Sequence, residues 1–106
     1  MNSFRFDKKT DELFSAILSL ETVKEAEAFF RALCTIDEIK AMSERFQIAK
    51  LVYKGMPYRD IAKKLGVSTT TVSRVAIWVF HGEGGYKAVL DKMPKSGFFK
   101  FLKRNK

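Results

Sequence analysis

The sequence has little of what metal sites, disulfides and membrane spans are built from. Its 106 residues include one cysteine, Cys34, and one histidine, His81, so an intramolecular disulfide is impossible and a zinc site is nearly so. No apolar run approaches the length of a membrane span, about 18 residues, and the first nine residues lack the apolar segment of a signal peptide. These absences predict a cytoplasmic protein that binds no metal and no membrane.

Groups that could carry catalysis are also scarce. No pair of carboxylates, Ser/His/Asp set or metal-binding cluster stands out, and one histidine and one cysteine leave few options. The glycine-rich segment Gly82–Gly85 lacks the preceding strand and the G-K-[ST] ending of a phosphate-binding loop. The sequence therefore disfavours an enzyme.

Positive charge and apolar side chains are abundant. Lys and Arg number 20 against 12 Asp and Glu, which gives a net charge of +8, and hydrophobic residues make up 46% of the chain. The apolar content is typical of a globular chain, and the length fits one domain. The excess of positive charge favours nucleic acid or an anionic membrane surface as a partner.

The apolar pattern predicts helices throughout, because no segment alternates long enough to suggest a strand. We expect one amphipathic helix to begin near Thr10 and a second at Thr22. Thr35 and Glu38 match the ends of a capping box, and a long helix should follow as far as Lys54. This long helix is apolar on two sides, so a second subunit is a plausible cover for one of them.

The most informative segment spans residues 58–77, which have the pattern of a helix-turn-helix. Gly66 is expected to supply the turn, and Ser68 the N-cap of a second helix that runs to about Ile77. The apolar positions of this segment should hold the two helices together, and they are Ile61, Ala62, Leu65, Val67, Val72 and Val75. The spacing predicts a DNA-binding unit whose second helix is the recognition helix.

Short polar side chains remain on the outer face of this second helix. Three successive threonines at an exposed helix start suggest a functional role, because threonine is a poor helix former. Hydroxyl groups can reach base edges, and threonine methyl groups can pack against thymine. The predicted DNA-binding residues are Arg59, Lys63, Lys64, Ser68, Thr69, Thr70, Thr71, Ser73 and Arg74. The threonines are expected to read bases and Arg59, Lys63, Lys64, Ser73 and Arg74 to hold phosphates, with a guanine as a second candidate for Arg59.

From about residue 33 to residue 93 the chain resembles the Trp repressor superfamily. The resemblance rests on residues 34–45, on the helix and glycine that follow, and on the helix-turn-helix ending in Thr-Val-Ser-Arg74. The segment Gly82–Tyr86 and the short length are similar to the YerC/YecD (TrpR-like) branch. The resemblance implies an all-α fold of about six helices, an interlocked homodimer, and one recognition helix per subunit on a palindromic operator.

The resemblance implies an effector pocket only in part. In the tryptophan-binding repressor a threonine and two arginines surround the ligand, and Thr35, Arg45 and Arg74 match these three. Val75 and Trp78 replace a glycine and a serine, and both add bulk where the ligand would enter. We therefore expect a vestigial pocket filled by the protein's own side chains. Tryptophan is not expected as co-repressor, which leaves constitutive binding or another small-molecule effector.

The sequence divides into a helical DNA-binding domain, residues 1–93, and a C-terminal tail, residues 94–106. The tail holds five basic residues and three phenylalanines, so it could pack on the core, contact phosphates or lie on a membrane. The segment is short for the membrane role.

Taken together, these features predict a sequence-specific transcriptional repressor that binds DNA as a homodimer. A helical protein-interaction module and an RNA-binding protein are the alternatives. The predicted recognition face lacks the aromatic side chains that stack on RNA bases.

Overall fold

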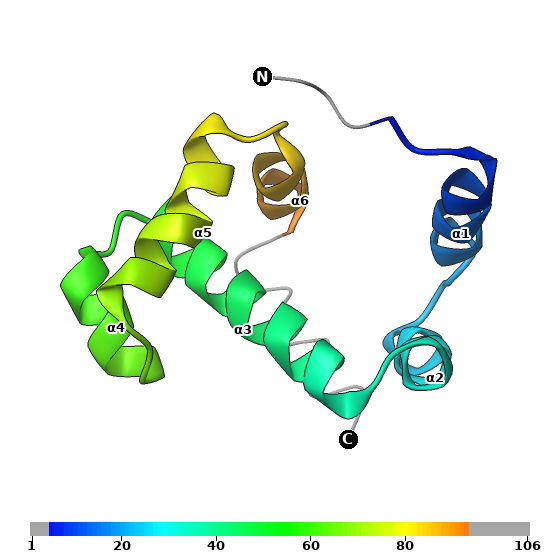
Figure 1. The fold of residues 1–106 in the computed structure, drawn as a ribbon, viewed down its shortest axis with the longest axis horizontal. Helices are drawn as coiled ribbons and strands as arrows, with labels where there is room; N and C mark the ends of the chain where they lie inside the picture. The colour runs from blue at the N-terminus through cyan, green and yellow to red at the C-terminus, as the bar shows by residue number, and fades with distance from the viewer. Residues whose placement is uncertain (1–4, 94–106) are drawn as a thin grey trace.

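The computed structural model describes residues 5–93, which form six α-helices and no strand (Figure 1). The helices are α1 (Lys8–Leu18), α2 (Val23–Leu33), α3 (Ile36–Tyr53), α4 (Tyr58–Leu65), α5 (Thr69–His81) and α6 (Gly85–Lys92). The predicted all-α fold class is confirmed. The predicted tail, residues 94–106, lies outside the described residues.

Side-chain caps fix where the first three helices begin. Thr22 caps α2 as predicted, and Thr35 and Glu38 form the predicted capping box at the start of α3. The predicted start of α1 is wrong: the N-cap is Asp7, whose carboxylate accepts a hydrogen bond from the backbone N–H of Thr10 at 2.9 Å. Thr10 therefore lies in the first turn of α1, and its hydroxyl group adds a second bond to Asp7 at 2.8 Å.

Glycine makes the turn between α4 and α5 possible. Gly66 has a φ of +69°, in the left-handed region that residues with a Cβ rarely adopt. The chain reverses there, and the backbone N–H of Val67 donates to the carbonyl oxygen of Ala62 at 3.0 Å. Ser68 then caps α5, as predicted. The predicted helix-turn-helix is present.

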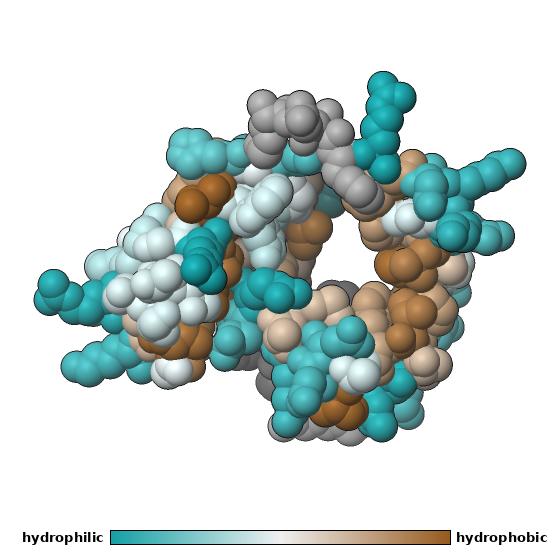
Figure 2. All heavy atoms as spheres, viewed as in Figure 1, coloured by the Kyte–Doolittle hydropathy of each residue, from teal (hydrophilic) through white to brown (hydrophobic). Residues whose placement is uncertain are grey.

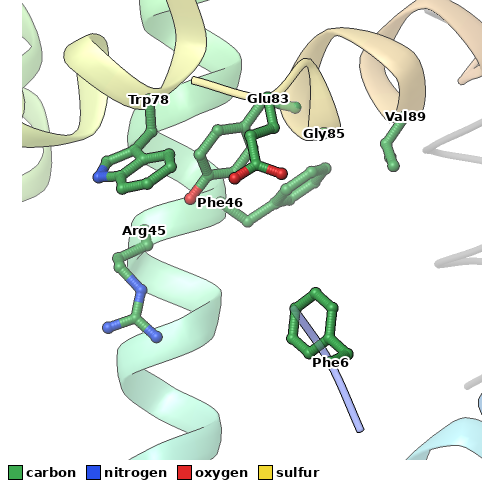
Figure 3. Close-up of a pocket in the computed structure, with 8 residues that line it drawn as sticks. Phe6, Arg45, Phe46, Trp78, Glu83, Gly85 and Val89 are labelled. Carbon is green, nitrogen blue, oxygen red and sulfur yellow. The ribbon is translucent and has the colours of Figure 1, made fainter. Parts of the chain in front are cut away.

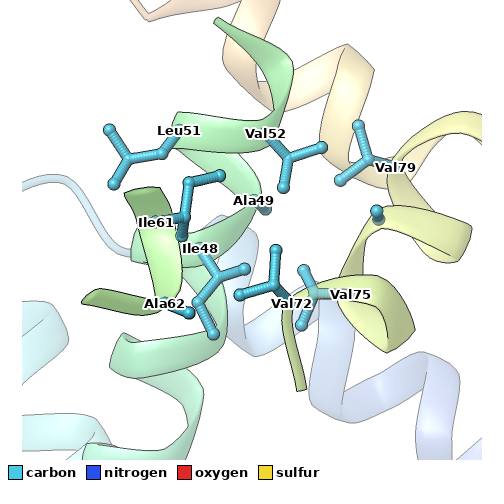
Figure 4. Close-up of a cluster of buried hydrophobic side chains, with 10 residues drawn as sticks. Ile48, Ala49, Leu51, Val52, Ile61, Ala62, Val72, Val75 and Val79 are labelled. Atoms are coloured by element: carbon cyan, nitrogen blue, oxygen red, sulfur yellow. The ribbon is translucent and has the colours of Figure 1, made fainter. Parts of the chain in front are cut away.

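The buried side chains form one cluster where α3, α4 and α5 meet (Figure 4). Ile48, Ile61 and Val72 are fully buried and supply one large side chain from each helix. Ala49, Leu51, Val52, Ala62, Val75, Ala76 and Val79 complete the cluster. Of the predicted apolar positions of the helix-turn-helix, Leu65 and Val67 are only partly buried and pack against the cluster. Burial of each large side chain contributes about 1.5–3 kcal/mol, so this cluster holds α4 and α5 in place.

The remaining helices bury no residue in the single chain. α1 and α2 lie apart from α5 and α6, and hydrophobic side chains gather on them at the right of Figure 2. Phe14, Leu18 and Leu33 are exposed on these two helices. The Cα radius of gyration is 15.2 Å, whereas a compact domain of this length has about 13 Å. None of the described helices is long and apolar enough to cross a membrane.

Candidate nucleic-acid interface

The core fixes α5 by one face and leaves the opposite face open. Val72, Val75, Ala76 and Val79 are buried, so every helical turn of α5 is attached to the cluster. The helix extends to His81, four residues beyond the predicted end at Ile77. Its first turn follows directly from the Gly66 turn, so the packing of α4 on α5 determines where the first turn points.

The predicted base-reading residues occupy the first turn of α5 with different surroundings. The side chains of Thr69 and Thr70 are exposed. Thr71 is half-buried, and its hydroxyl oxygen lies 2.9 Å from the Ser68 hydroxyl oxygen. Ser68 Oγ also accepts a hydrogen bond from the backbone N–H of Thr71 at 3.0 Å. The hydroxyl groups of Ser68 and Thr71 are therefore used to start the helix, which leaves those of Thr69 and Thr70 facing solvent.

The predicted phosphate-contacting residues are all exposed. Ser73 and Arg74 lie one turn beyond the threonines on α5, and Arg59, Lys63 and Lys64 lie on α4. The salt bridge that the described residues form with one another joins Lys87 to Asp91 on α6, away from these cations. Arginine and lysine side chains without a carboxylate partner are suited to bind phosphate.

Charge is distributed unevenly along the chain. Residues 48–81 carry six lysines and arginines against one carboxylate, Asp60, a net charge of +5. Residues 5–47 carry seven against nine, a net charge of −2. Among the described residues, the positive charge therefore coincides with the helix-turn-helix and not with the first two helices, as a site for nucleic acid requires.

Four of the five predicted effector-pocket residues line one hollow beside α5. This hollow has a volume of about 330 Å³ and is lined by Arg45, Arg74, Val75, Ile77, Trp78 and Tyr86. Thr35 is not among them, because it caps α3 three helical turns before Arg45, about 15 Å along the axis. A single subunit therefore does not bring Thr35 to the two arginines.

A second, larger hollow, drawn in Figure 3, shares Arg45, Trp78 and Tyr86 with the first. Its volume is about 820 Å³, and Phe6, Arg45, Phe46, Trp78, Glu83, Gly85, Tyr86 and Val89 line it. Val75 faces the core and is 6% exposed, whereas Trp78 is 54% exposed at the edge of both hollows. Val75 and Trp78 thus line this region in the single chain, and the filling of the pocket by side chains stays a prediction.

Two features of this region were missed at the level of sequence. A Cβ on Gly82 would lie 2.6 Å from the carbonyl oxygen of Trp78 and 2.7 Å from its ring, so this glycine is needed for close packing. In addition, the Tyr53 hydroxyl donates to the Asp91 carboxylate, and the Lys87 ammonium group lies 2.9 Å from the same carboxylate. These bonds lower the pKa of Asp91, raise that of Lys87 and attach α6 to the end of α3.

Comparison with known proteins identifies the family. The sequence profile of the Trp repressor protein matches residues 8–94. The chain belongs to the Trp repressor family. This Trp repressor family member is 37% identical over 89 residues to the uncharacterized protein YerC of Bacillus subtilis (strain 168). The aligned region covers 84% of this chain and 86% of YerC. The predicted family, including its YerC-like branch, is confirmed.

Solved structures agree with the fold of this Trp repressor family member. A TrpR-like protein from Eubacterium eligens ATCC 27750 is 43% identical, has a TM-score of 0.76, and aligns over 81% of this chain and 89% of its own. A structure from Staphylococcus aureus is 42% identical, has a TM-score of 0.77, and aligns over 83% of this chain and 88% of its own. The arrangement of the six described helices is therefore the TrpR-like fold.

Proposed function

We propose that this chain is a sequence-specific DNA-binding transcriptional regulator, a repressor that binds a palindromic operator as a homodimer. The observation that carries the proposal is the orientation of α5. Its buried valines fix it in the core, and the polar side chains of its first two turns face outward. In helix-turn-helix proteins these positions meet base edges in the major groove. Membership of the Trp repressor family and the positive charge of residues 48–81 support the proposal.

The exposed residues then divide into two roles. Thr69 and Thr70 read base edges and thymine methyl groups, because their side chains face solvent at the tip of α5. Arg74 holds the phosphate backbone. Ser73, Arg59, Lys63 and Lys64 share this phosphate role, with a guanine as the second candidate for Arg59. The main role of Ser68 and Thr71 is to fix the start of α5 through the hydrogen bonds between them.

The homodimer is proposed because α1 and α2 leave apolar faces open in the single chain. A second copy would cover these faces and place two recognition helices on successive major grooves, about 34–36 Å apart. Light scattering at micromolar concentration should give twice the 12.2 kDa of one chain. A monomer mass would contradict the dimer and remove the reason to expect a palindrome.

We further propose that tryptophan is not the co-repressor of this protein. We also propose that the protein works in the cytoplasm as a regulator rather than an enzyme. Val75 and Trp78 replace the glycine and serine of the tryptophan-binding repressor, so the hollow beside α5 has a different lining from a tryptophan site. The two hollows leave room for a different small-molecule effector. The affinity of the protein for DNA should therefore be the same with and without L-tryptophan at about 1 mM, a concentration that would occupy a site even with a weak dissociation constant. A tenfold tightening would contradict this view.

Selection of bound duplexes from a random DNA pool, at about 150 mM salt, tests the function directly. A palindromic consensus is expected. Enrichment without a consensus would mean non-specific binding, and enrichment from a parallel RNA pool alone would establish the RNA-binding alternative. No enrichment from either pool would favour the protein-interaction module.

A further inference from the structure

The last described helix, α6, depends on contacts with other helices more than on its own sequence. It is eight residues long, and its N-cap, Gly84, supplies no side-chain hydrogen bond. A helix this short is not stable alone in water, and its first residue, Gly85, is a poor helix former. None of its residues, all of which the structure describes, is buried in the single chain. The stability of α6 therefore comes from the places where it touches α3 and α5 (Figure 1).

Contacts near both ends of α6 attach it to the rest of the described chain. At its start, Tyr86 packs against the buried cluster of α3, α4 and α5. Near its end, the Asp91 carboxylate accepts hydrogen bonds from the Tyr53 hydroxyl group of α3 and from the Lys87 ammonium group, the latter at 2.9 Å. Lys87 also donates to the Tyr53 hydroxyl oxygen at 3.4 Å. We call Tyr53, Lys87 and Asp91 the α6 clasp. The side chains of Lys87 and Asp91 are 62% and 47% exposed, so water competes for these bonds.

The charges of the α6 clasp oppose the preferences of α6 itself. Lys87 lies in the first turn and Asp91 in the last, whereas the helix dipole favours acids at the start and cations at the end. A lysine four residues before an acid is also the weaker order for an ion pair along a helix. The two charges therefore gain little as a pair within α6. The bond from the Tyr53 hydroxyl group makes their placement favourable, because it joins α6 to α3.

α6 also forms one wall of the two hollows beside α5. Tyr86 lines the smaller hollow, and Gly85, Tyr86 and Val89 line the larger one (Figure 3). The chain enters α6 at Gly84, whose φ of +84° lies in the left-handed region. A Cβ on Gly84 or Gly85 would meet nothing within 4 Å, so the start of α6 is not crowded by other atoms. Movement of α6 about these two glycines would open the larger hollow on that side.

We infer that α6 is a flap that opens and closes as one unit over the two hollows, and that the α6 clasp holds it closed. Opening breaks the clasp and the packing of Tyr86 but leaves the buried cluster intact, so it requires less free energy than unfolding of the core. A ligand in the larger hollow would touch Tyr86 and Val89 and would favour the closed form. The flap goes beyond the proposed function, and its test needs no DNA.

Native-state hydrogen exchange of the full chain tests whether α6 opens separately. The backbone N–H groups of Ala88 and Met93 donate to the carbonyl oxygens of Gly84 and Val89, so they are protected only while α6 is folded. We expect the amides of residues 88–93 to share one opening constant and to be less protected than those of α3, α4 and α5. Ile61→Val removes a buried methylene group from α4 and should speed exchange in the core but not in α6. Equal acceleration in both would overturn the flap.

Variants of the α6 clasp test what holds the flap closed. Tyr53→Phe leaves the sequence of α6 unchanged and should speed exchange of residues 88–93 by about two- to fivefold, as expected for an exposed polar contact. Lys87→Gln and Asp91→Asn should act in the same direction. If the helix dipole alone mattered, both would slow exchange, because each removes a charge that the dipole disfavours.

Tyr58→Phe is the matched control, because it removes a hydroxyl group from α4, and it should leave exchange in α6 unchanged. Slower or unchanged exchange in the Tyr53, Lys87 and Asp91 variants would overturn the clasp. Protection of α6 that rises with protein concentration would overturn the flap as well, because a second copy would then be what holds α6 in place.

Discussion

Replacement of Gly82 by alanine tests how the end of α5 is packed. Gly82 has a φ of −84°, which any residue can adopt, so the substitution introduces no backbone strain of its own. The added Cβ would instead lie 2.6 Å from the carbonyl oxygen of Trp78, and a backbone atom cannot move aside cheaply. Overpacking of this kind costs about 1–3 kcal/mol. For a domain of this size, each 1 kcal/mol lowers the melting temperature by about 4–8 °C.

The assay combines thermal unfolding with the fluorescence of Trp78, the single tryptophan of the chain. We expect Gly82→Ala to melt at a lower temperature and to shift the Trp78 emission, because the ring lies 2.7 Å from the added carbon. Gly85→Ala is the matched control, since its Cβ would meet nothing within 4 Å and Gly85 begins α6. An unchanged melting temperature and emission in Gly82→Ala would refute the packing argument.

Three further substitutions test the interface, the core and a cap. Arg74→Ala should weaken binding to all duplexes alike and lower the salt slope by about 0.9; a change in the preferred sequence alone would show that its assigned role is wrong. Val72→Ala should lower the free energy of unfolding by about 2–3 kcal/mol in urea titration, because Val72 is fully buried. A loss below 0.5 kcal/mol would mean that the site is not buried, since exposed sites change by roughly that much.

Thr35→Ala should destabilise the protein by about 1 kcal/mol in the same titration through loss of the N-cap. The bonds from Thr35 lower the pKa of Glu38, so their contribution is present above its usual value of 4.5 and is lost as the pH falls through the lower folded value. Thr35→Ala keeps the backbone N–H that donates to the Glu38 carboxylate, so the pH dependence is tested with Glu38→Ala instead. The difference between wild type and Glu38→Ala should shrink in acid, and a constant difference would contradict the capping-box assignment.

The sequence predicted the caps and turns that depend on residues close together in the chain. The capping box needs only Thr35 and Glu38, three residues apart, and the Gly66 turn needs one glycine between two short apolar patterns. Asp7 was missed although it stands three residues before Thr10, because two cap residues compete there and the chain uses the earlier one. Helix boundaries of this kind depend on which side chain accepts a hydrogen bond from the first free backbone N–H groups.

Contacts between distant parts of the chain were beyond sequence reasoning. The bond between Tyr53 and Asp91 joins residues 38 apart, and no sequence pattern pairs one with the other. The position of Trp78 shows a related limit: a Cβ on Gly82 would lie 2.7 Å from its ring, and no sequence pattern indicates this close approach. The apolar pattern indicates which residues a helix can bury. It does not predict the orientation of an aromatic ring at the margin of the buried face.

The core of this molecule comes from one uninterrupted stretch, residues 48–79. Contacts between residues near in sequence form quickly, because little chain entropy is lost when short loops close. The three helices of this stretch should therefore assemble before α1 and α2 find their place. In denaturant-jump experiments, α3, α4 and α5 should gain hydrogen-exchange protection at a rate independent of protein concentration. The first two helices should gain theirs in a later, concentration-dependent step, so that the DNA-reading part of each chain matures before pairing with another copy.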